Sequence, residues 1–150
     1  MSAAIRPDFV LDTSVSAAWV IDAQITPYKR SVLKSLLTKT AIVPALWHIE
    51  MSNLLCKYAR KNNLNMSNVE VHLASLAALS IKTFEWDASK VARLKYNAMR
   101  SVTQTALKHG LTSYDAQYLQ LALRENLPLA SCDEQLCASA KEAGVAIYQP

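Results

Sequence analysis

Short apolar runs alternate with longer segments of helical periodicity along this chain. The runs cover residues 9–11, 41–43, 81–84, 127–131 and 145–148. The segments between them repeat apolar residues every three or four positions, as amphipathic helices do, over 14–22, 27–37, 46–61, 67–79, 88–108, 113–125 and 134–143. Strands that alternate with helices favour a parallel sheet. We predict an α/β fold with a central parallel β-sheet of four or five strands, flanked by about seven helices.

Several predicted helix ends contain residues that suit such positions. Pro27 suits a first helical turn and Asp87 suits an N-cap, while Gly110 and Gly144 suit the left-handed residue that closes a helix. These two glycines are the only ones in the chain. A Gly-rich phosphate loop is therefore excluded, and we expect no nucleotide cofactor.

Length and composition indicate one domain, 1–150, with a core from about 8 to 148, because 150 residues that are 51% hydrophobic can bury a substantial core. No apolar run approaches the roughly 18 residues of a membrane span, and the N-terminus lacks the apolar segment of a signal peptide. We expect a cytoplasmic protein with no membrane contact. The three cysteines lack C-x-x-C spacing, so we expect reduced, structural thiols rather than zinc ligands.

The chain is moderately basic, with a formal net charge of +4 and a pI near 9.0. This charge is compatible with an anionic partner, but many proteins without one share it. Basic residues cluster loosely on two predicted helices, at offsets typical of solvated faces: Lys57, Arg60, Lys61 and Lys90, Arg93, Lys95, Arg100.

Four carboxylates occupy unusual positions. Glu50 and Asp115 each interrupt an apolar helical stripe, whereas Asp12 and Asp133 each follow an apolar run and precede a helix. A carboxylate in an apolar setting must be paired, hydrogen-bonded, protonated or bound to a cation. Carboxyl ends of parallel strands are also where open α/β folds bind ligands. Together the four acids indicate a metal site; for Glu50 and Asp115 the alternative is a buried salt bridge, which is rarely a net stabiliser.

Simple capping roles are the alternative for the two strand-end acids. Asp12 could cap the helix that starts near Ser14, and Asp133 could lie in the first turn of the last helix. Ser131 and Glu134 are spaced as the reciprocal pair of a capping box, which would leave Asp133 available for another role. Ser14 and Ser131 each lie two residues from an acid, so they could cap helices or hydrogen-bond the neighbouring carboxylate.

Four sequence blocks, in order along the chain, resemble PIN-domain ribonucleases, in particular the VapC-type toxin of a VapBC toxin–antitoxin pair. The resemblance spans residues 10–148. The first block is a hydrophobic-Asp-x-Ser strand end at 10–15, and the second is a Pro…Glu-x-x-Asn helix with Pro44, Glu50 and Asn53. The third block is a Tyr-Asp-Ala-x-Tyr-Leu motif at 114–119. The fourth is a Pro-Leu-x-Thr-x-Asp-x-x-Leu segment at 128–136, where Ser131 occupies the Thr position.

This resemblance implies a PIN-like domain in which the four acids converge on a pocket for one or two Mg²⁺ or Mn²⁺ ions. An all-carboxylate site suits these hard ions rather than zinc. The implied activity is cleavage of single-stranded or loop RNA by metal-activated water. A homodimer and a cognate antitoxin protein are the implied partners, and a catalytically silent PIN-like module that binds RNA or protein is the alternative.

Each site residue has an expected role. Asp12 and Asp115 are the leading metal ligands, Asp133 completes the set, and Glu50 binds a second metal or orients the attacking water. The supporting residues are Ser14, Asn53 and Ser131. The chain departs from many relatives in two places: only Asp22 provides an acid just after the first helix, and the predicted helix over 88–108 is long.

Overall fold

A four-stranded, all-parallel sheet forms the centre of the protein. The computed structural model describes residues 6–21, 25–84 and 91–150. The strands are β1 (Phe9–Leu11), β2 (Ala41–Val43), β3 (Ile81–Thr83) and β4 (Leu129–Ala130), and they lie in the order β3-β2-β1-β4. In register, Val10 pairs with Ile42 on one side and with Leu129 on the other. The predicted α/β class is confirmed.

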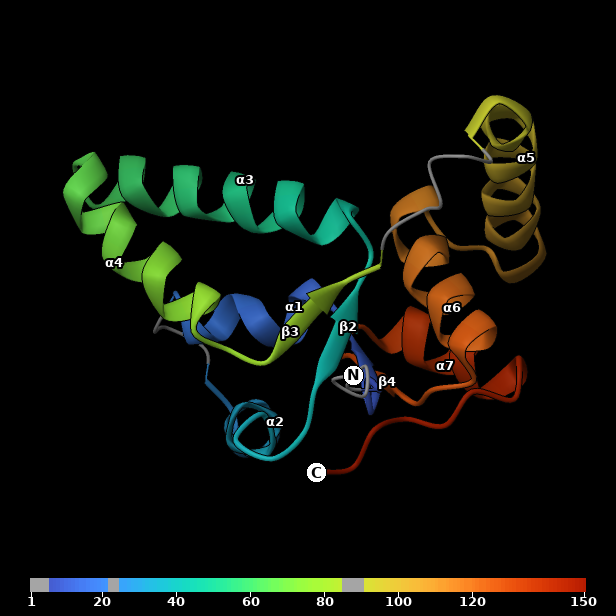
Figure 1. Cartoon of the computed structure of the whole chain (residues 1–150), viewed down its shortest axis with the longest axis horizontal. Helices are drawn as coiled ribbons and strands as arrows, with labels where there is room; N and C mark the ends of the chain where they lie inside the picture. Colours follow the sequence, from blue (N-terminus) through green and yellow to red (C-terminus); the bar gives the residue numbers. More distant parts are fainter. Residues whose placement is uncertain (1–5, 22–24, 85–90) are drawn as a thin grey trace, which may run out of the picture.

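Helices lie on both sides of this sheet. Helices α3 and α4 lie on one side, and α5, α6 and α7 lie on the other (Figure 1). Their bounds are α1 (Thr13–Ser16), the 3-10 helix η1 (Ala17–Trp19), α2 (Pro27–Ser35), α3 (Leu46–Lys61), α4 (Met66–Ala77), α5 (Val91–His109), α6 (Ser113–Glu125) and α7 (Glu134–Glu142). The described residues form seven α-helices, in agreement with the predicted number.

The first predicted helix, over 14–22, is wrong in length. The chain forms the single turn α1 and then the tighter η1, which ends at Trp19. The indole Nε1 of Trp19 donates to the Lys29 carbonyl in α2 at 2.9 Å. Because this contact crosses to another helix, periodicity along the chain could not predict it. The expected auxiliary acid Asp22 and the expected N-cap Asp87 lie outside the described residues.

The fifth apolar run, 145–148, pairs with the sheet through one bridge, from Ile147 to Leu129. Strand β4 is only two residues long, so it offers little backbone for a further strand. The run is nevertheless fixed in place, because Tyr148 stacks on Phe9 with ring centroids 3.9 Å apart. It therefore closes one edge of the core without forming a full strand.

The core lies between the sheet and its helices. All residues of β1 are fully buried, as are Tyr118 and Leu119 of α6. Gly110 and Gly144 have φ of +63° and +81°, which confirms that they close α5 and α7 in the left-handed conformation. In the part of the chain that the structure describes, no helix is long and apolar enough to cross a membrane.

The prediction of structural cysteines is wrong for two of the three. All three thiols are unpaired, but Cys56 and Cys132 are exposed and only Cys137 is half-buried. Cys56 lies on an outer face of α3, and Cys132 lies in the turn between β4 and α7. Free cysteines are often buried, but these two side chains lie at the protein surface.

Candidate active site

The Asp12 carboxylate lies at the carboxyl end of the central strand. Its backbone N–H donates to the Ala130 carbonyl at 3.0 Å, which extends the β1–β4 pairing to this residue. Asp12 is 5% exposed and occupies the N-cap position of α1, but its side chain makes no capping hydrogen bond. Capping therefore does not explain this buried acid.

Two serine hydroxyls hold one oxygen of Asp12. Ser14 Oγ donates to Asp12 Oδ2 at 2.5 Å, and Ser131 Oγ donates to the same oxygen at 2.7 Å. Ser14 Oγ in turn accepts from the backbone N–H of Cys132 at 2.9 Å. The other carboxylate oxygen, Oδ1, has no hydrogen-bond partner among the described residues. One side of Asp12 is thus fixed, and the other can accept a ligand.

Glu50 reaches the same end of the sheet from α3. Its Oε2 accepts from Thr13 Oγ1 at 2.9 Å and from the hydroxyl of Tyr118, and the two hydroxyls are themselves 2.7 Å apart. Tyr118 is fully buried. Since both bonds involve Oε2, the second oxygen, Oε1, makes no hydrogen bond within the described structure. A half-buried acid is thus oriented by two hydroxyls from other elements.

Asp115 lies in the first turn of α6 and is half-buried. Thr112, the N-cap of this helix, accepts from the Asp115 backbone N–H at 3.1 Å and donates its hydroxyl to Asp115 Oδ2 at 2.6 Å. This reciprocal arrangement resembles a capping box and fixes the carboxylate. As for Glu50, one oxygen is held and the other has no hydrogen-bond partner in the described ranges.

The predicted capping box at Ser131 and Glu134 is wrong. Asp133 is itself the N-cap of α7, and its Oδ1 accepts from the Leu136 N–H at 2.7 Å. The hydroxyl of Ser131 cannot cap this helix because it accepts from the Asp133 N–H at 3.0 Å and donates to Asp12. Asp133 is exposed. One of its oxygens is therefore committed to the helix, and only the other is available to a ligand.

Asn53 does not join this network. It lies on α3, one turn after Glu50, and is exposed. Its side chain has no hydrogen bond to any other residue in 6–21, 25–84 or 91–150. Its expected supporting role remains a prediction, without a contact to the acids.

Three of the acids act on one another electrostatically. Burial raises the pKa of the Asp12 carboxyl, the hydrogen bonds from Ser14 and Ser131 oppose this rise, and the negative charges of Glu50 and Asp115 add to it. Burial and the hydrogen bond to Glu50 raise the pKa of the Tyr118 hydroxyl, so it remains a neutral donor. The site is therefore electronegative, and a proton or a cation at Asp12 would relieve it.

No protein cation provides that relief within the described residues. The ion pairs found there are Lys39 with Asp8, His109 with Glu142 and Arg124 with Glu125, and none includes a site acid. The buried salt bridges considered for Glu50 and Asp115 are thus absent from the described part. The donor chemistry, oxygen only, fits a hard divalent ion.

The acids do not form a complete set of metal ligands by themselves. Among the described side chains, no group of three or more His, Cys, Asp or Glu is positioned to hold a metal ion. This geometry argues against zinc, which needs three or four protein ligands. It is compatible with Mg²⁺, which keeps several waters and is bound through one or two carboxylates. Asp12 and Asp115, each with one unoccupied oxygen, fit that description.

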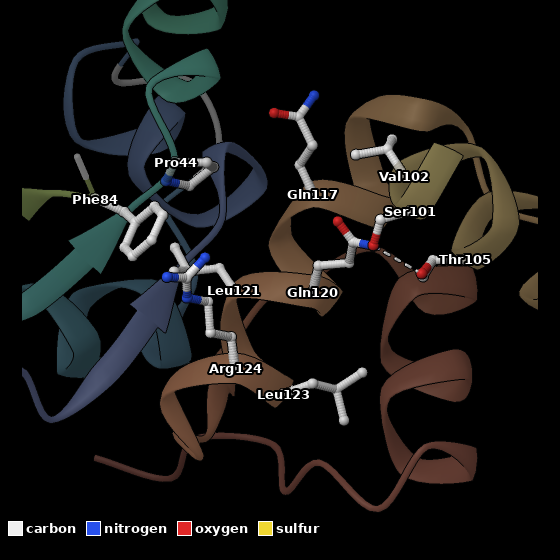
Figure 2. Close-up of a pocket in the computed structure, with 10 residues that line it drawn as sticks. All are labelled: Pro44, Phe84, Ser101, Val102, Thr105, Gln117, Gln120, Leu121, Leu123 and Arg124. Atoms are coloured by element: carbon white, nitrogen blue, oxygen red, sulfur yellow. Dashed lines mark hydrogen bonds between the residues drawn. The ribbon is translucent and has the colours of Figure 1, made fainter. Parts of the chain in front are cut away.

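Two cavities of the described structure are possible substrate sites. One, of about 620 Å³, is lined by Thr13, Ser14 and Asp133 together with Lys29 and Lys61. The other, of about 420 Å³, lies between α5 and α6. Figure 2 shows Arg124 beside Phe84 on one wall of this cavity. On the other wall, Gln120 is hydrogen-bonded to Ser101 and Thr105. None of the four acids lines the second cavity, so the first is the candidate substrate site.

Sequence reasoning missed three residues that orient the acids. Thr13 and Tyr118 hold Glu50, and Thr112 holds Asp115. A signal existed for Thr112, because Thr-x-x-Asp before an apolar helix is a capping pattern. Tyr118 follows Asp115 by three positions on the same helix face, but its contact with Glu50 spans 68 residues and is a tertiary feature.

The comparisons with known proteins agree on the fold. The family model described as "PIN domain" matches residues 9–142. PAE2754 from Pyrobaculum aerophilum has a similar structure, with 23% identity, a TM-score of 0.65, and coverage of 91% of this chain and 87% of that one. FitAcB from Neisseria gonorrhoeae is also similar, with 20% identity, a TM-score of 0.60, and coverage of 95% and 97%. No curated protein matches the chain significantly.

Proposed function

The chain belongs to the PIN domain family, generally a nuclease fold, and we propose that it is a Mg²⁺- or Mn²⁺-dependent endoribonuclease that cleaves single-stranded or loop RNA. The main support is the buried Asp12 carboxylate, which is acted on by the charges of Glu50 and Asp115 and has no ion-pair partner among the described residues. An uncompensated buried acid costs stability, and perturbed acids of this kind concentrate at functional sites. The catalytic domain in this proposal extends from about residue 8 to 148.

Asp12 and Asp115 would hold the ion together with waters. Asp133 would join them as a third ligand only after its side chain moves closer, because the described acids are not grouped in threes. When bound, a divalent ion lowers the pKa of a coordinated water and offsets the negative charge of the phosphate. Ser14 and Ser131 restrict Asp12 to one orientation, so that its Oδ1 remains available. Such supporting hydrogen bonds are typical of metal ligands.

Glu50 has a different role in this scheme. Thr13 and Tyr118 hold its Oε2, so that Oε1 can accept a hydrogen bond from the attacking water and orient it. No histidine lies among these groups, so Glu50 is the candidate to take up the proton of the attacking water. Because two hydroxyls orient it before substrate binds, little reorganisation is needed during the reaction.

The test is cleavage of structured and unstructured RNAs by the purified protein with Mn²⁺ or with EDTA. We expect cleavage of unpaired RNA with Mn²⁺, none with EDTA, and loss of activity in Asp115→Asn. Glu70→Gln is the control, because Glu70 is an exposed acid on α4. Metal-independent cleavage, or cleavage undiminished in Asp115→Asn, would contradict the proposal.

The proposed biological context is that of a VapC-type toxin with a cognate antitoxin, acting as a homodimer. The order of the four sequence blocks supports the toxin assignment. Tyr96, Met99 and Leu107 form an exposed apolar face of α5, which supports an interface. Light scattering should give a dimer mass, reduced to a monomer by Met99→Lys. A small DNA-binding protein encoded in the adjacent reading frame would be the expected antitoxin.

A further inference from the structure

The cavity of about 620 Å³ borders the candidate active site through Asp133. Its lining includes Asp133 and also Thr13 and Ser14, which hydrogen-bond to Glu50 and Asp12. Its walls also include Lys29 from α2 and Lys61 from α3. The cavity therefore brings two positive charges to the space beside Asp133 and the side chains that hold Asp12 and Glu50.

Lys29 is held in place by its backbone. Its N–H donates to Thr26 Oγ1 at 3.3 Å, and its carbonyl accepts from the indole of Trp19 at 2.9 Å. The residue is half-buried. Lys29, Cys132 and Asp133 all line this cavity, so the Lys29 side chain borders the same space as Asp133.

Lys61 lies on the same helix as Glu50. Eleven residues separate them, which is about three turns, so both side chains leave the same face of α3 about 16 Å apart along its axis. Lys61 is exposed and lies in the last turn of the helix. Of the basic cluster Lys57, Arg60 and Lys61, it is the member that lines this cavity.

Neither lysine is neutralised by a carboxylate in the described structure. The ion pairs found there involve Lys39, His109 and Arg124 instead. A site with four acids repels a polyanionic strand, so productive binding requires positive charge beside it. Lysine binds phosphate as a compact point charge, which suits contacts to a flexible backbone.

We propose that Lys29 and Lys61 bind backbone phosphates of a single RNA strand that lies along this cavity, next to the phosphate that is cleaved. The assignment rests on the proposed ribonuclease function and adds the path of the substrate. Both are positioning residues: they increase affinity for the strand and take no part in bond breaking. An acidic segment of a protein partner is the rival occupant. The strand that is cleaved is favoured because Asp133 lines the same cavity, as do Thr13 and Ser14, which hold Glu50 and Asp12.

The test compares two double variants with the same change in net charge. Lys29→Gln/Lys61→Gln removes the cavity pair. Lys34→Gln/Lys108→Gln is the matched control, because both control lysines are exposed, lie in the last turn of a helix and line none of the cavities described above. Lys29→Arg/Lys61→Arg keeps both charges and should restore binding. Thermal melting in EDTA establishes that each variant is folded.

Binding is measured by the anisotropy of a labelled single-stranded oligoribonucleotide in EDTA at several salt concentrations. The cavity variant should bind at least about tenfold more weakly, and the magnitude of its salt slope should fall by about 1.4, since each lost phosphate contact on a single strand contributes about 0.7. With Mn²⁺, its KM for cleavage should rise while kcat changes less than about twofold. The control should match the wild type.

Several outcomes would overturn the assignment. Equal weakening in both double variants would show an effect of net charge alone. A lower kcat with unchanged KM would indicate a role in chemistry. Unchanged RNA binding with weakened binding of poly-glutamate would identify an acidic peptide as the occupant. If the wild type cleaves RNA but the cavity variant behaves identically, the lysine assignment fails and the ribonuclease function remains. If the wild type binds RNA through the lysines but does not cleave it, the ribonuclease function fails.

Discussion

Removal of the Tyr118 hydroxyl tests the support of Glu50 most directly. Tyr118 is fully buried, its hydroxyl donates to Glu50, and the same oxygen lies 2.7 Å from Thr13 Oγ1. Tyr118→Phe deletes only this oxygen and keeps the ring in the core. Any effect therefore reports on the hydrogen bonds and on the orientation of Glu50.

The expected loss of stability follows from the contacts that remain. A hydrogen bond to a charged group contributes about 1.5–3 kcal/mol. Thr13 Oγ1 still donates to Glu50 at 2.9 Å, so the carboxylate is not left without a partner. We therefore expect Tyr118→Phe to lower the free energy of unfolding by about 2 kcal/mol and, at this chain length, Tm by about 4–8 °C. Cleavage should fall by about 10–100-fold, as when a residue that supports a metal site is lost.

The assay is urea and thermal unfolding in EDTA, followed by cleavage with Mn²⁺. Tyr114→Phe is the matched control, because Tyr114 lies on the same helix but is 58% exposed and makes no hydrogen bond with the described residues. The control should change the free energy of unfolding by less than about 0.5 kcal/mol. A similarly small change for Tyr118→Phe would refute the hydrogen-bond network deduced around Glu50.

Three further predictions concern the strand-end acids. Asp133→Ala should remove the N-cap of α7 and lower the free energy of unfolding by about 1 kcal/mol, whereas Asp133→Asn should keep the cap and lose only the charge. Urea unfolding and cleavage assays together then separate the capping role of Asp133 from its role at the active site. In EDTA, Asp12→Asn should raise Tm at pH 7. Because the pKa of Asp12 is raised in the folded protein, its contribution to stability is fully present below the unfolded pKa near 4 and is lost as pH rises through the folded pKa. The Tm of Asp12→Asn minus the Tm of the wild type should therefore grow from about pH 4 upward. A difference that shrank over this range would contradict the prediction. Mg²⁺ or Mn²⁺ should raise Tm of the wild type through linkage but not that of Asp12→Asn, and an equal shift in both would exclude Asp12 as a ligand.

Most of the fold could be predicted because its signals are local. Helices 46–61 and 113–125 begin and end where their apolar periodicity does. The first helix and the last strand could not, because contacts with other elements accompany their ends: Trp19 donates a hydrogen bond to Lys29 in α2, and residues 145–148 meet a strand only two residues long. Periodicity reports which face a residue prefers, but it does not report where a neighbouring element ends a helix or strand.

The sequence alone indicated the four acids as candidate site residues and determined the type of element that carries each one, because polar interruptions of apolar patterns and strand-to-helix boundaries are local properties. Only the tertiary structure decided the partner of each acid. Ser131 bonds to Asp12 across 119 residues and Tyr118 meets Thr13 across 105, through the pairing of β1 with β4 and the packing of α6 on β1. It also decided between the capping alternatives, since Asp12 makes no cap and Asp133 makes one. A hydroxyl has one proton to donate, and which oxygen receives it depends on distances that only the folded chain sets.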